Sequence, residues 1–148
     1  MEESVVSMSD EYTKGIEMLV EQLNIKDVRQ LSPLQLAYIG DAVYELLVRT
    51  YILSKKNISV HHLHKEAIKY VKAKAQRDIL FSIEENLTEE EWNVVKRGRN
   101  AKSGTVPKNA DLQDYKYSTG FEALIGFLYL LKRYDRLDEI FNMIIKQH

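Results

Sequence analysis

The sequence predicts an all-α protein with a single domain, and three observations support this prediction. Only two prolines and six glycines interrupt the 148 residues, and no segment alternates apolar and polar residues as a half-buried strand does. Apolar side chains instead recur every three or four residues, which is the spacing of one helix face. Two capping boxes mark helix starts, at Ser32-Pro33-Leu34-Gln35 and Thr88-Glu89-Glu90-Glu91.

The composition is ordinary for a globular protein and excludes several kinds of site. Apolar residues make up 45% of the chain and charged residues 29%. Cysteine is absent, which excludes disulfides and thiolate metal sites. No apolar run approaches the roughly 20 residues that a membrane-spanning helix needs. The acidic N-terminus lacks the basic and apolar segments of a secretory signal peptide, so we expect a cytoplasmic protein.

The first half of the chain predicts a short helical segment and then a long helix. Residues 1–30 carry no motif, and the stretch from Tyr12 to Leu23 has helical periodicity. The first capping box opens a helix at Pro33 that we expect to end near Leu53. Its apolar residues cover almost the whole circumference, which is typical of a helix inside a core or an oligomer interface. We therefore expect an unassigned N-terminal segment followed by one domain over residues 31–148.

The second half predicts further helices and one long loop. Residues 60–86 form a helical stretch with a break near Lys72, and the second capping box opens a helix that Gly98 is expected to end. Residues 99–116 lack periodicity, and long loops inside compact domains are often functional. The last two predicted helices span 118–133, which is very apolar, and 135–146.

The nearly neutral net charge hides an uneven distribution. Residues 1–45 hold nine acidic and three basic residues, whereas residues 46–148 hold thirteen acidic and eighteen basic ones. From Trp92 to Ala110 there is no acidic residue, and the basic residues there are Lys96, Arg97, Arg99, Lys102 and Lys108. Such a cationic stretch on a neutral protein favours a surface that contacts a polyanion. A solvated lysine-rich face remains the alternative.

Two acidic residues interrupt apolar runs that look like buried helices. Asp41 lies in Ile39-Gly40-Asp41-Ala42-Val43, and Glu122 lies in Phe121-Glu122-Ala123-Leu124-Ile125-Gly126. A buried carboxylate is costly unless it is paired or binds a cation. Glycines at 40, 120 and 126 would let the two helices approach closely. This pattern indicates a site for Mg²⁺ or Mn²⁺ between two helices, although edge positions or structural ion pairs would also explain the two acids.

Together with Arg97-Gly98-Arg99-Asn100-Ala101-Lys102-Ser103-Gly104 and Tyr117-Ser118-Thr119, the two acidic runs resemble the signatures of the ribonuclease III catalytic domain. The similarity is closest to the Mini-III branch of that family, which consists of the catalytic domain alone. It implies an all-helical homodimer that joins through the first signature helix. It also implies a metal-dependent endoribonuclease that cuts double-stranded RNA and leaves 5′-phosphate ends. Asp41 and Glu122 match the essential aspartate and glutamate, which are both catalytic and metal-binding.

The sequence departs from ribonuclease III at two other metal-site acids. Ala37 stands where the family has a glutamate, and Thr119 stands where it has an aspartate. We therefore expect one tightly bound Mg²⁺, with Mn²⁺ as a possible substitute. Glu45 shares a helix face with Asp41, so Glu45 and Thr119 are candidates for supporting positions beside the metal-binding acids. A buried ion pair with Arg49, one turn further along the helix, would explain Glu45 equally well.

Ribonuclease III normally adds a separate domain for binding double-stranded RNA after the catalytic one, and this sequence shows no such domain, so we expect affinity to come from the catalytic dimer itself. Contacts would go to phosphates and 2′-hydroxyls, because A-form RNA hides its major groove. The candidate RNA-binding residues are Arg97, Arg99, Asn100, Lys102, Ser103 and Lys108. For Arg97 and Arg99, complementing the helix dipole is the alternative role.

The resemblance further implies a biological target. That target is precursor 23S ribosomal RNA, with a large-subunit ribosomal protein as a possible partner. The main alternative is a catalytically silent dimer that only binds structured RNA, which the losses at Ala37 and Thr119 would favour. A helical scaffold with no RNA role would leave the acid-free basic stretch unexplained.

Overall fold

The computed structural model describes residues 18–102 and 106–147 and divides the chain into two units, the second beginning at Ser32. In the first unit, residues 18–21 are helical and the helix α2 spans Ile25–Gln30. The Asn24 side chain accepts a hydrogen bond from the Asp27 backbone N–H at 2.9 Å and caps α2. Most of the helix expected over Tyr12–Leu23 falls outside the described residues.

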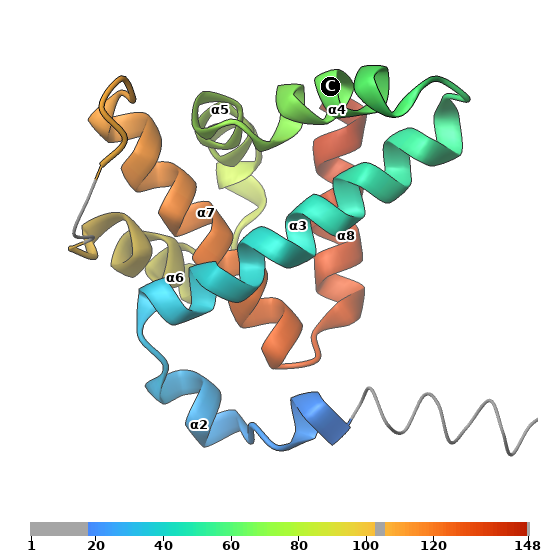
Figure 1. The fold of residues 1–148 in the computed structure, drawn as a ribbon. Coiled ribbons are helices and arrows are strands. Elements are labelled where there is room, and N and C mark those ends of the chain that lie inside the picture. The colour runs from blue at the N-terminus through green and yellow to red at the C-terminus, as the bar shows by residue number, and fades with distance from the viewer. Residues whose placement is uncertain (1–17, 103–105, 148) are drawn as a thin grey trace, which may run out of the picture. The chain divides into compact units, whose positions relative to one another are not determined.

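The second unit consists of helices, and the described residues contain no strand (Figure 1). This confirms the all-α prediction. None of the described helices combines the length and hydrophobicity needed to cross a bilayer. The elements are α3 (Pro33–Lys55), α4 (Val60–Val71), α5 (Ala73–Ile83), the 3₁₀ turn η1 (Glu84–Asn86), α6 (Glu89–Asn100), α7 (Leu112–Leu130) and α8 (Tyr134–Gln147).

Local signals in the sequence predicted several helix boundaries correctly. Ser32 Oγ accepts a hydrogen bond from the Gln35 N–H at 3.1 Å, and the Gln35 side chain accepts one from the Ser32 N–H at 2.9 Å. The second capping box forms in the same way at the start of α6. The break near Lys72 is also confirmed, because this residue is extended between α4 and α5 with φ −64° and ψ 151°.

Two boundaries near the long loop were predicted wrongly. Gly98 does not end α6, which continues to Asn100, because this glycine lies inside the helix where the backbone of α7 approaches. The helix α7 begins at Leu112 rather than at Ser118, because the Asp111 side chain accepts a hydrogen bond from the Asp114 N–H at 2.9 Å and caps it. The loop is therefore shorter than the predicted 99–116 and connects Asn100 to Leu112.

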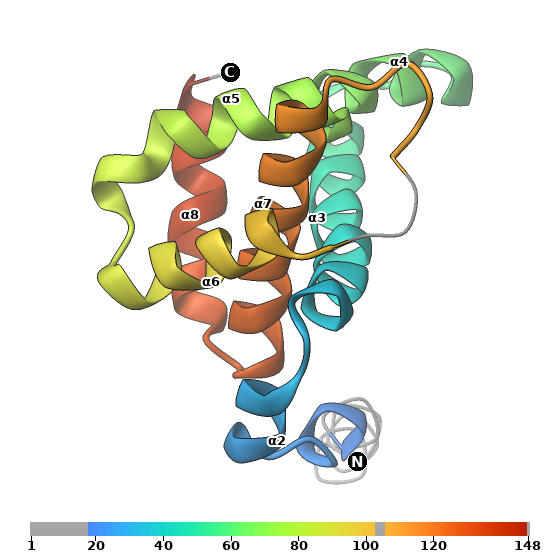
Figure 2. The same ribbon diagram turned by 90° about the vertical axis from the view of Figure 1, so that its left-hand side faces the viewer.

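The most buried helix of the second unit is α7, which packs against α3, α5, α6 and α8 (Figures 1 and 2). Its side chains are buried around nearly the whole helix from Ser118 to Leu128, with Glu122 as the partly exposed exception. A helix that is apolar all round must have partners on every side, which is the role α7 has here. It therefore determines where the other helices can place functional groups.

Glycines allow α7 to touch two of its neighbours through the backbone. A Cβ atom on Gly40 of α3 would lie 1.7 Å from the carbonyl oxygen of Glu122, and one on Gly126 would lie 1.9 Å from that of Leu36. On another side of α7, a Cβ on Gly98 of α6 would lie 2.7 Å from the Cα of Gly120. The close approach predicted for Gly40, Gly120 and Gly126 is confirmed, and Gly98 is a fourth such position that was not predicted. No side chain fits at either crossing.

We predict that Gly40→Ala lowers the free energy of unfolding by about 3 kcal/mol or more, because the added methyl group overlaps the Glu122 carbonyl and must push α3 and α7 apart. Alanine is the better helix former by about 1 kcal/mol, so any loss of stability has to come from packing. Urea denaturation measures the difference. Thr50→Ala, at an exposed position of the same helix, is the matched control and should change little. A Gly40→Ala protein as stable as the control would contradict the packing account.

Candidate active site

The close crossing of α3 and α7 brings Asp41 and Glu122 together. Gly40 touches the Glu122 backbone, so the next residue along α3 carries its carboxyl group to the Glu122 side chain. The two carboxyl groups are close enough to share a hydrogen bond when one of them is protonated. Residues far apart in the sequence therefore form one acidic pair at the junction of two helices.

The two acids differ in exposure, and one part of the sequence interpretation was wrong. Asp41 was interpreted as a buried residue, but its side chain is exposed. The buried side of α3 is formed by other residues, which include Leu36, Gly40, Tyr44 and Val48. Glu122 is partly buried on α7. The pair thus has one carboxyl group open to solvent and one set back between helices.

This arrangement disfavours a negative charge on Glu122. Burial raises the pKa of Glu122 to about 9, together with the hydrogen bond to Asp41 and the nearby negative charges of Asp41 and Glu45. The neighbouring Gln76 side chain works in the opposite direction and lowers the pKa of Glu122. Two carboxylates in contact repel each other unless a proton or a cation lies between them. The pair therefore has the electrostatic character of a cation site.

The other acids and the threonine near the pair have partners of their own. Glu45 lies one helical turn after Asp41 and accepts a hydrogen bond from Arg49 at 2.7 Å, so the ion pair considered from the sequence forms, although it is exposed rather than buried. The Thr119 hydroxyl donates to the Tyr115 carbonyl at 3.1 Å within α7. Ala37 is buried one turn before Asp41. Of these three positions only Glu45 is acidic. Its negative charge acts on Glu122, but its carboxylate is paired with Arg49.

The residues present fit a divalent ion with few protein ligands. Among residues 18–102 and 106–147, no group of three or more His, Asp or Glu side chains is arranged to hold a metal ion. Two carboxylates are nevertheless a common protein contribution to Mg²⁺ binding, because this ion usually keeps several of its waters. An exposed Asp41 leaves room for those waters.

Sequence analysis missed two polar residues next to the pair. Gln76 of α5 is buried, and its Oε1 accepts a hydrogen bond of 2.6 Å from the Ser118 hydroxyl of α7. Ser118 belongs to the Tyr117-Ser118-Thr119 motif and lies four residues before Glu122 on the same helix face, and these two signals in the sequence had been given no role. Gln76 gave no such signal, because it is a single polar residue on the apolar face of its helix.

The predicted RNA-binding residues cluster at the end of α6 and in the loop that follows. Arg97, Asn100, Lys102 and Lys108 are exposed, while Ser103 lies outside the described residues. The contact of Gly98 with Gly120 places this end of α6 against the turn of α7 that precedes Glu122. We call Arg97, Arg99, Lys102 and Lys108, with Asn100 and Ser103, the basic cluster. The end of α6 that carries its first residues packs on the same segment of α7 that carries Glu122.

Arg99 differs from the other basic residues because its side chain is partly buried. Its guanidinium lies over the ring of Tyr117, 5.7 Å from the centroid, and its Nε donates to the Asn100 side chain at 3.1 Å. Arg77 of α5 lies 5.5 Å from the centroid of the same ring and also donates to Asp114 at 3.1 Å. These cation–π contacts fix Arg99 where α6 and α7 meet.

Comparisons with known proteins agree with this geometry. Residues 34–133 match the Ribonuclease III domain family. A Mini-ribonuclease 3 from Clostridium tetani is 53% identical over 128 residues, which cover 86% of this chain and 85% of the relative. A Mini-ribonuclease 3 from a Thermoanaerobacter species is 52% identical over 126 residues, covering 85% and 89%. A crystal structure of a Fusobacterium nucleatum protein has a TM-score of 0.73 and 38% identity, covering 82% of this chain and 97% of that one.

The match spans both acidic runs and the basic cluster, and the resemblance inferred from the motifs is confirmed. The chain belongs to the ribonuclease III domain family and is an endoribonuclease.

Proposed function

We propose that this endoribonuclease cleaves double-stranded RNA at a divalent cation held by Asp41 and Glu122. The observation that supports the proposal is the contact between these two carboxyl groups, one exposed and one partly buried, on two helices of a ribonuclease III domain. Mg²⁺ is the preferred ion and Mn²⁺ a substitute, since both favour oxygen ligands. When bound, such an ion would activate water for attack on the phosphorus and stabilise charge on the phosphate. We infer from the family resemblance that the bond to the 3′-oxygen breaks, which leaves a 3′-hydroxyl on one product and a 5′-phosphate on the other.

The basic cluster is the proposed contact for the RNA backbone. Arg97, Lys102 and Lys108 are exposed, and Asn100 can donate to phosphate or 2′-hydroxyl oxygens. We assign Ser103 to the same surface from the sequence motif alone. Arg99 would contribute from its position over Tyr117. Glu45 and Thr119 are proposed to support the metal-binding acids. Glu45 would act through its negative charge, and Thr119 would act from its position one turn before Glu122 on α7.

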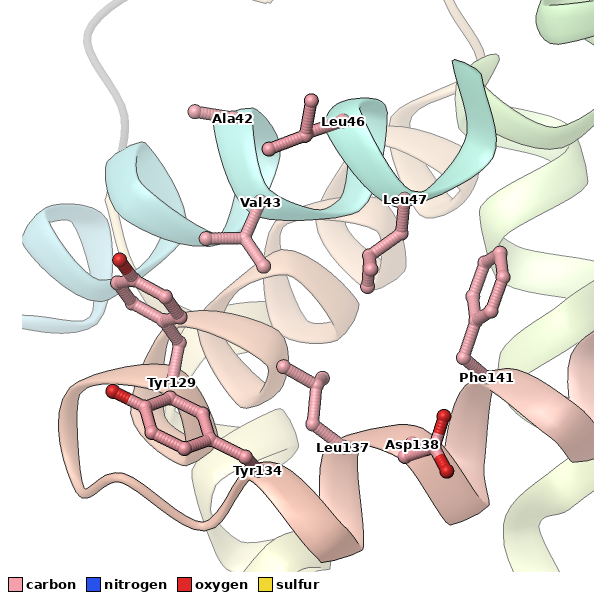
Figure 3. Close-up of a pocket in the computed structure, with 9 residues that line it drawn as sticks. All are labelled: Ala42, Val43, Leu46, Leu47, Tyr129, Tyr134, Leu137, Asp138 and Phe141. Carbon is pink, nitrogen blue, oxygen red and sulfur yellow. The ribbon is translucent and has the colours of Figure 1, made fainter. Parts of the chain in front are cut away.

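We also propose that two copies of the chain form a homodimer through α3. Large apolar side chains on this helix remain exposed in the single chain: Tyr38 by 79%, Leu46 by 66% and Leu53 by 64%. Beside them, an apolar groove of about 440 Å³ lies between α3 and α8 (Figure 3). Figure 3 shows Val43 and Leu47 of α3 across the groove from Leu137 and Phe141 of α8. Exposed apolar patches of this kind mark interfaces, and a second copy would cover both surfaces symmetrically.

The biological role follows from the family rather than from the site geometry. We propose that residues 31–148 form the catalytic domain and that its cytoplasmic target is precursor 23S ribosomal RNA, with a large-subunit ribosomal protein as a partner. The curated relatives are named Mini-ribonuclease 3, which supports a role like theirs. The competing proposal is a dimer that binds structured RNA without cutting it. Ala37 and Thr119, which replace two acids of ribonuclease III, are the observation that favours it.

Asp41→Asn and Glu122→Gln should each reduce the cleavage rate of an end-labelled RNA duplex by at least about 100-fold, because each removes a charged ligand of the cation. EDTA should abolish cleavage by the wild type, and added Mg²⁺ should restore it. The exposed Asp135→Asn on α8 is the matched control and should cleave normally. RNA binding without cleavage by the wild type under Mg²⁺ or Mn²⁺ would instead support the silent dimer.

Replacing Arg97, Arg99 and Lys102 with alanine should weaken duplex RNA binding and reduce its salt dependence. If all three contact phosphates, the slope of log K against log salt concentration falls by about 2, since each contact contributes roughly 0.7–0.9. Filter binding at 50–200 mM salt measures both effects. Lys146→Ala on α8 serves as a single-charge control at an exposed position. An unchanged slope in the triple variant would remove the basic cluster from the RNA path.

Leu46→Glu should convert the dimer into a folded monomer, because it places a charge in the centre of the exposed apolar face of α3. Light scattering should then give half the mass of the wild type, with unchanged helical circular dichroism. Leu112→Glu introduces the same charge at an exposed leucine of α7 and should remain dimeric. A dimeric Leu46→Glu protein, or a monomeric wild type, would show that α3 is not the interface.

A further inference from the structure

A buried glutamine on α5 links two helices beside the acidic pair. Gln76 is 1% exposed and lies among the apolar residues that α5 turns towards α7. Its Oε1 accepts a hydrogen bond from Ser118 Oγ at 2.6 Å, and its Nε2 donates to the Val71 carbonyl at 3.0 Å. A buried amide of this kind costs free energy unless its polar atoms have hydrogen-bond partners. These partners therefore determine where the Gln76 amide lies and how it is oriented.

These two hydrogen bonds fix which way the amide points. The helix α4 ends at Val71, so the carbonyl of this residue lacks a partner in its own helix and takes one from Gln76. If the amide were turned by half a revolution, its oxygen would face that carbonyl oxygen and the hydrogen bond would be lost. The NH₂ group therefore stays on the side of Val71 and has a second N–H to donate.

That second N–H is available to Glu122. The Gln76 amide is a neighbour of the Glu122 carboxyl group and favours its charged form. Ser118, which the amide oxygen binds, lies one turn before Glu122 on the face of α7 that meets α5. The result is a chain of contacts that runs from Ser118 through Gln76 to Glu122 and ends at Asp41. Ser118 holds the amide oxygen and the Val71 carbonyl holds the amide nitrogen, so the amide is fixed beside Glu122.

We propose that Gln76 is a positioning residue that holds the Glu122 carboxylate in the orientation in which it binds the divalent cation with Asp41. This inference rests on the proposed function of the acidic pair. A neutral amide is suited to the task because it donates to the carboxylate without adding charge or competing for the ion. Hydrogen-bond partners of metal ligands typically contribute 10–100-fold to metal affinity. Ser118 supports the same carboxylate indirectly, by holding the amide oxygen.

The test measures binding of Mn²⁺ alone by isothermal titration calorimetry on the full chain. Gln76→Met keeps the approximate size of the side chain but removes both N–H donors, and it should weaken Mn²⁺ binding by roughly 10–100-fold. Ser118→Ala should weaken it in the same direction by a smaller factor. Tyr44→Phe is the control, because it removes another buried hydrogen bond, from Tyr44 to the Tyr70 carbonyl at 3.1 Å, and should bind Mn²⁺ as the wild type does.

Cleavage of an RNA duplex gives a second readout. The Mn²⁺ concentration for half-maximal cleavage should rise with Gln76→Met, and saturating Mn²⁺ should bring the rate back towards that of the wild type. A general loss of structure would lower the rate at every Mn²⁺ concentration and would affect Tyr44→Phe as well. If Gln76→Met does not fold, Ser118→Ala alone carries the comparison with Tyr44→Phe.

The outcomes separate this inference from the proposed function. If Glu122→Gln abolishes cleavage and Mn²⁺ binding while Gln76→Met and Ser118→Ala match the wild type in both, the site stands and the positioning role of Gln76 is wrong. If Glu122→Gln cleaves and binds Mn²⁺ normally, the proposed site is wrong, and the role of Gln76 falls with it. Weaker binding in Gln76→Met and Ser118→Ala, with Tyr44→Phe unchanged, supports both.

Discussion

The contact between Gly40 and the backbone of Glu122 is the constraint on which the rest of the site depends. At most helix crossings side chains separate the two axes, but here a Cβ atom would lie 1.7 Å from a carbonyl oxygen, so α3 and α7 meet through their backbones. Gly126 repeats the contact one turn along α7 against Leu36. Two short side chains, an aspartate and a glutamate, reach each other only because the helices lie this close. The carboxylate pair is thus a consequence of the crossing of α3 and α7.

The same helix also places the basic cluster. Gly98 and Gly120 repeat the backbone contact on another side of α7, so the C-terminal end of α6 meets α7 just before Glu122. Tyr117 then lies within 6 Å of two guanidinium groups, those of Arg77 and Arg99. Cations that attract a phosphate backbone and acids suited to a metal ion are therefore arranged around one segment of α7. The positions of Arg97 and Arg99 relative to the acids depend on the packing of α6 on α7, whereas Lys102 and Lys108 lie in the loop between these helices.

The sequence predicted what local signals determine and missed what depends on distant partners. The starts of α3 and α6 and the break at Lys72 follow from caps and periodicity within a few residues, and these predictions are confirmed. The end of α6 was predicted wrongly because Gly98, a usual helix stop, is here required by a partner on α7. The exposure of Asp41 was missed for a similar reason, since a helix that is apolar nearly all round does not reveal which side its neighbours cover. Gln76 has no local signal, because its partner Ser118 is 42 residues away.

Asp41 and Glu122 have unequal environments, and this difference suits a site with only two carboxylates. A fully buried pair would be hard to charge, and a fully exposed pair would be mobile and would hold an ion weakly. Here Glu122 is partly buried beside a neutral amide, while Asp41 faces solvent, where water and a phosphate group have access. A proton and a metal ion compete for the same carboxylates. Gln76 favours the charged form of Glu122, which is the form that the proposed cation would bind, and Ala37 and Thr119 supply no further acid there.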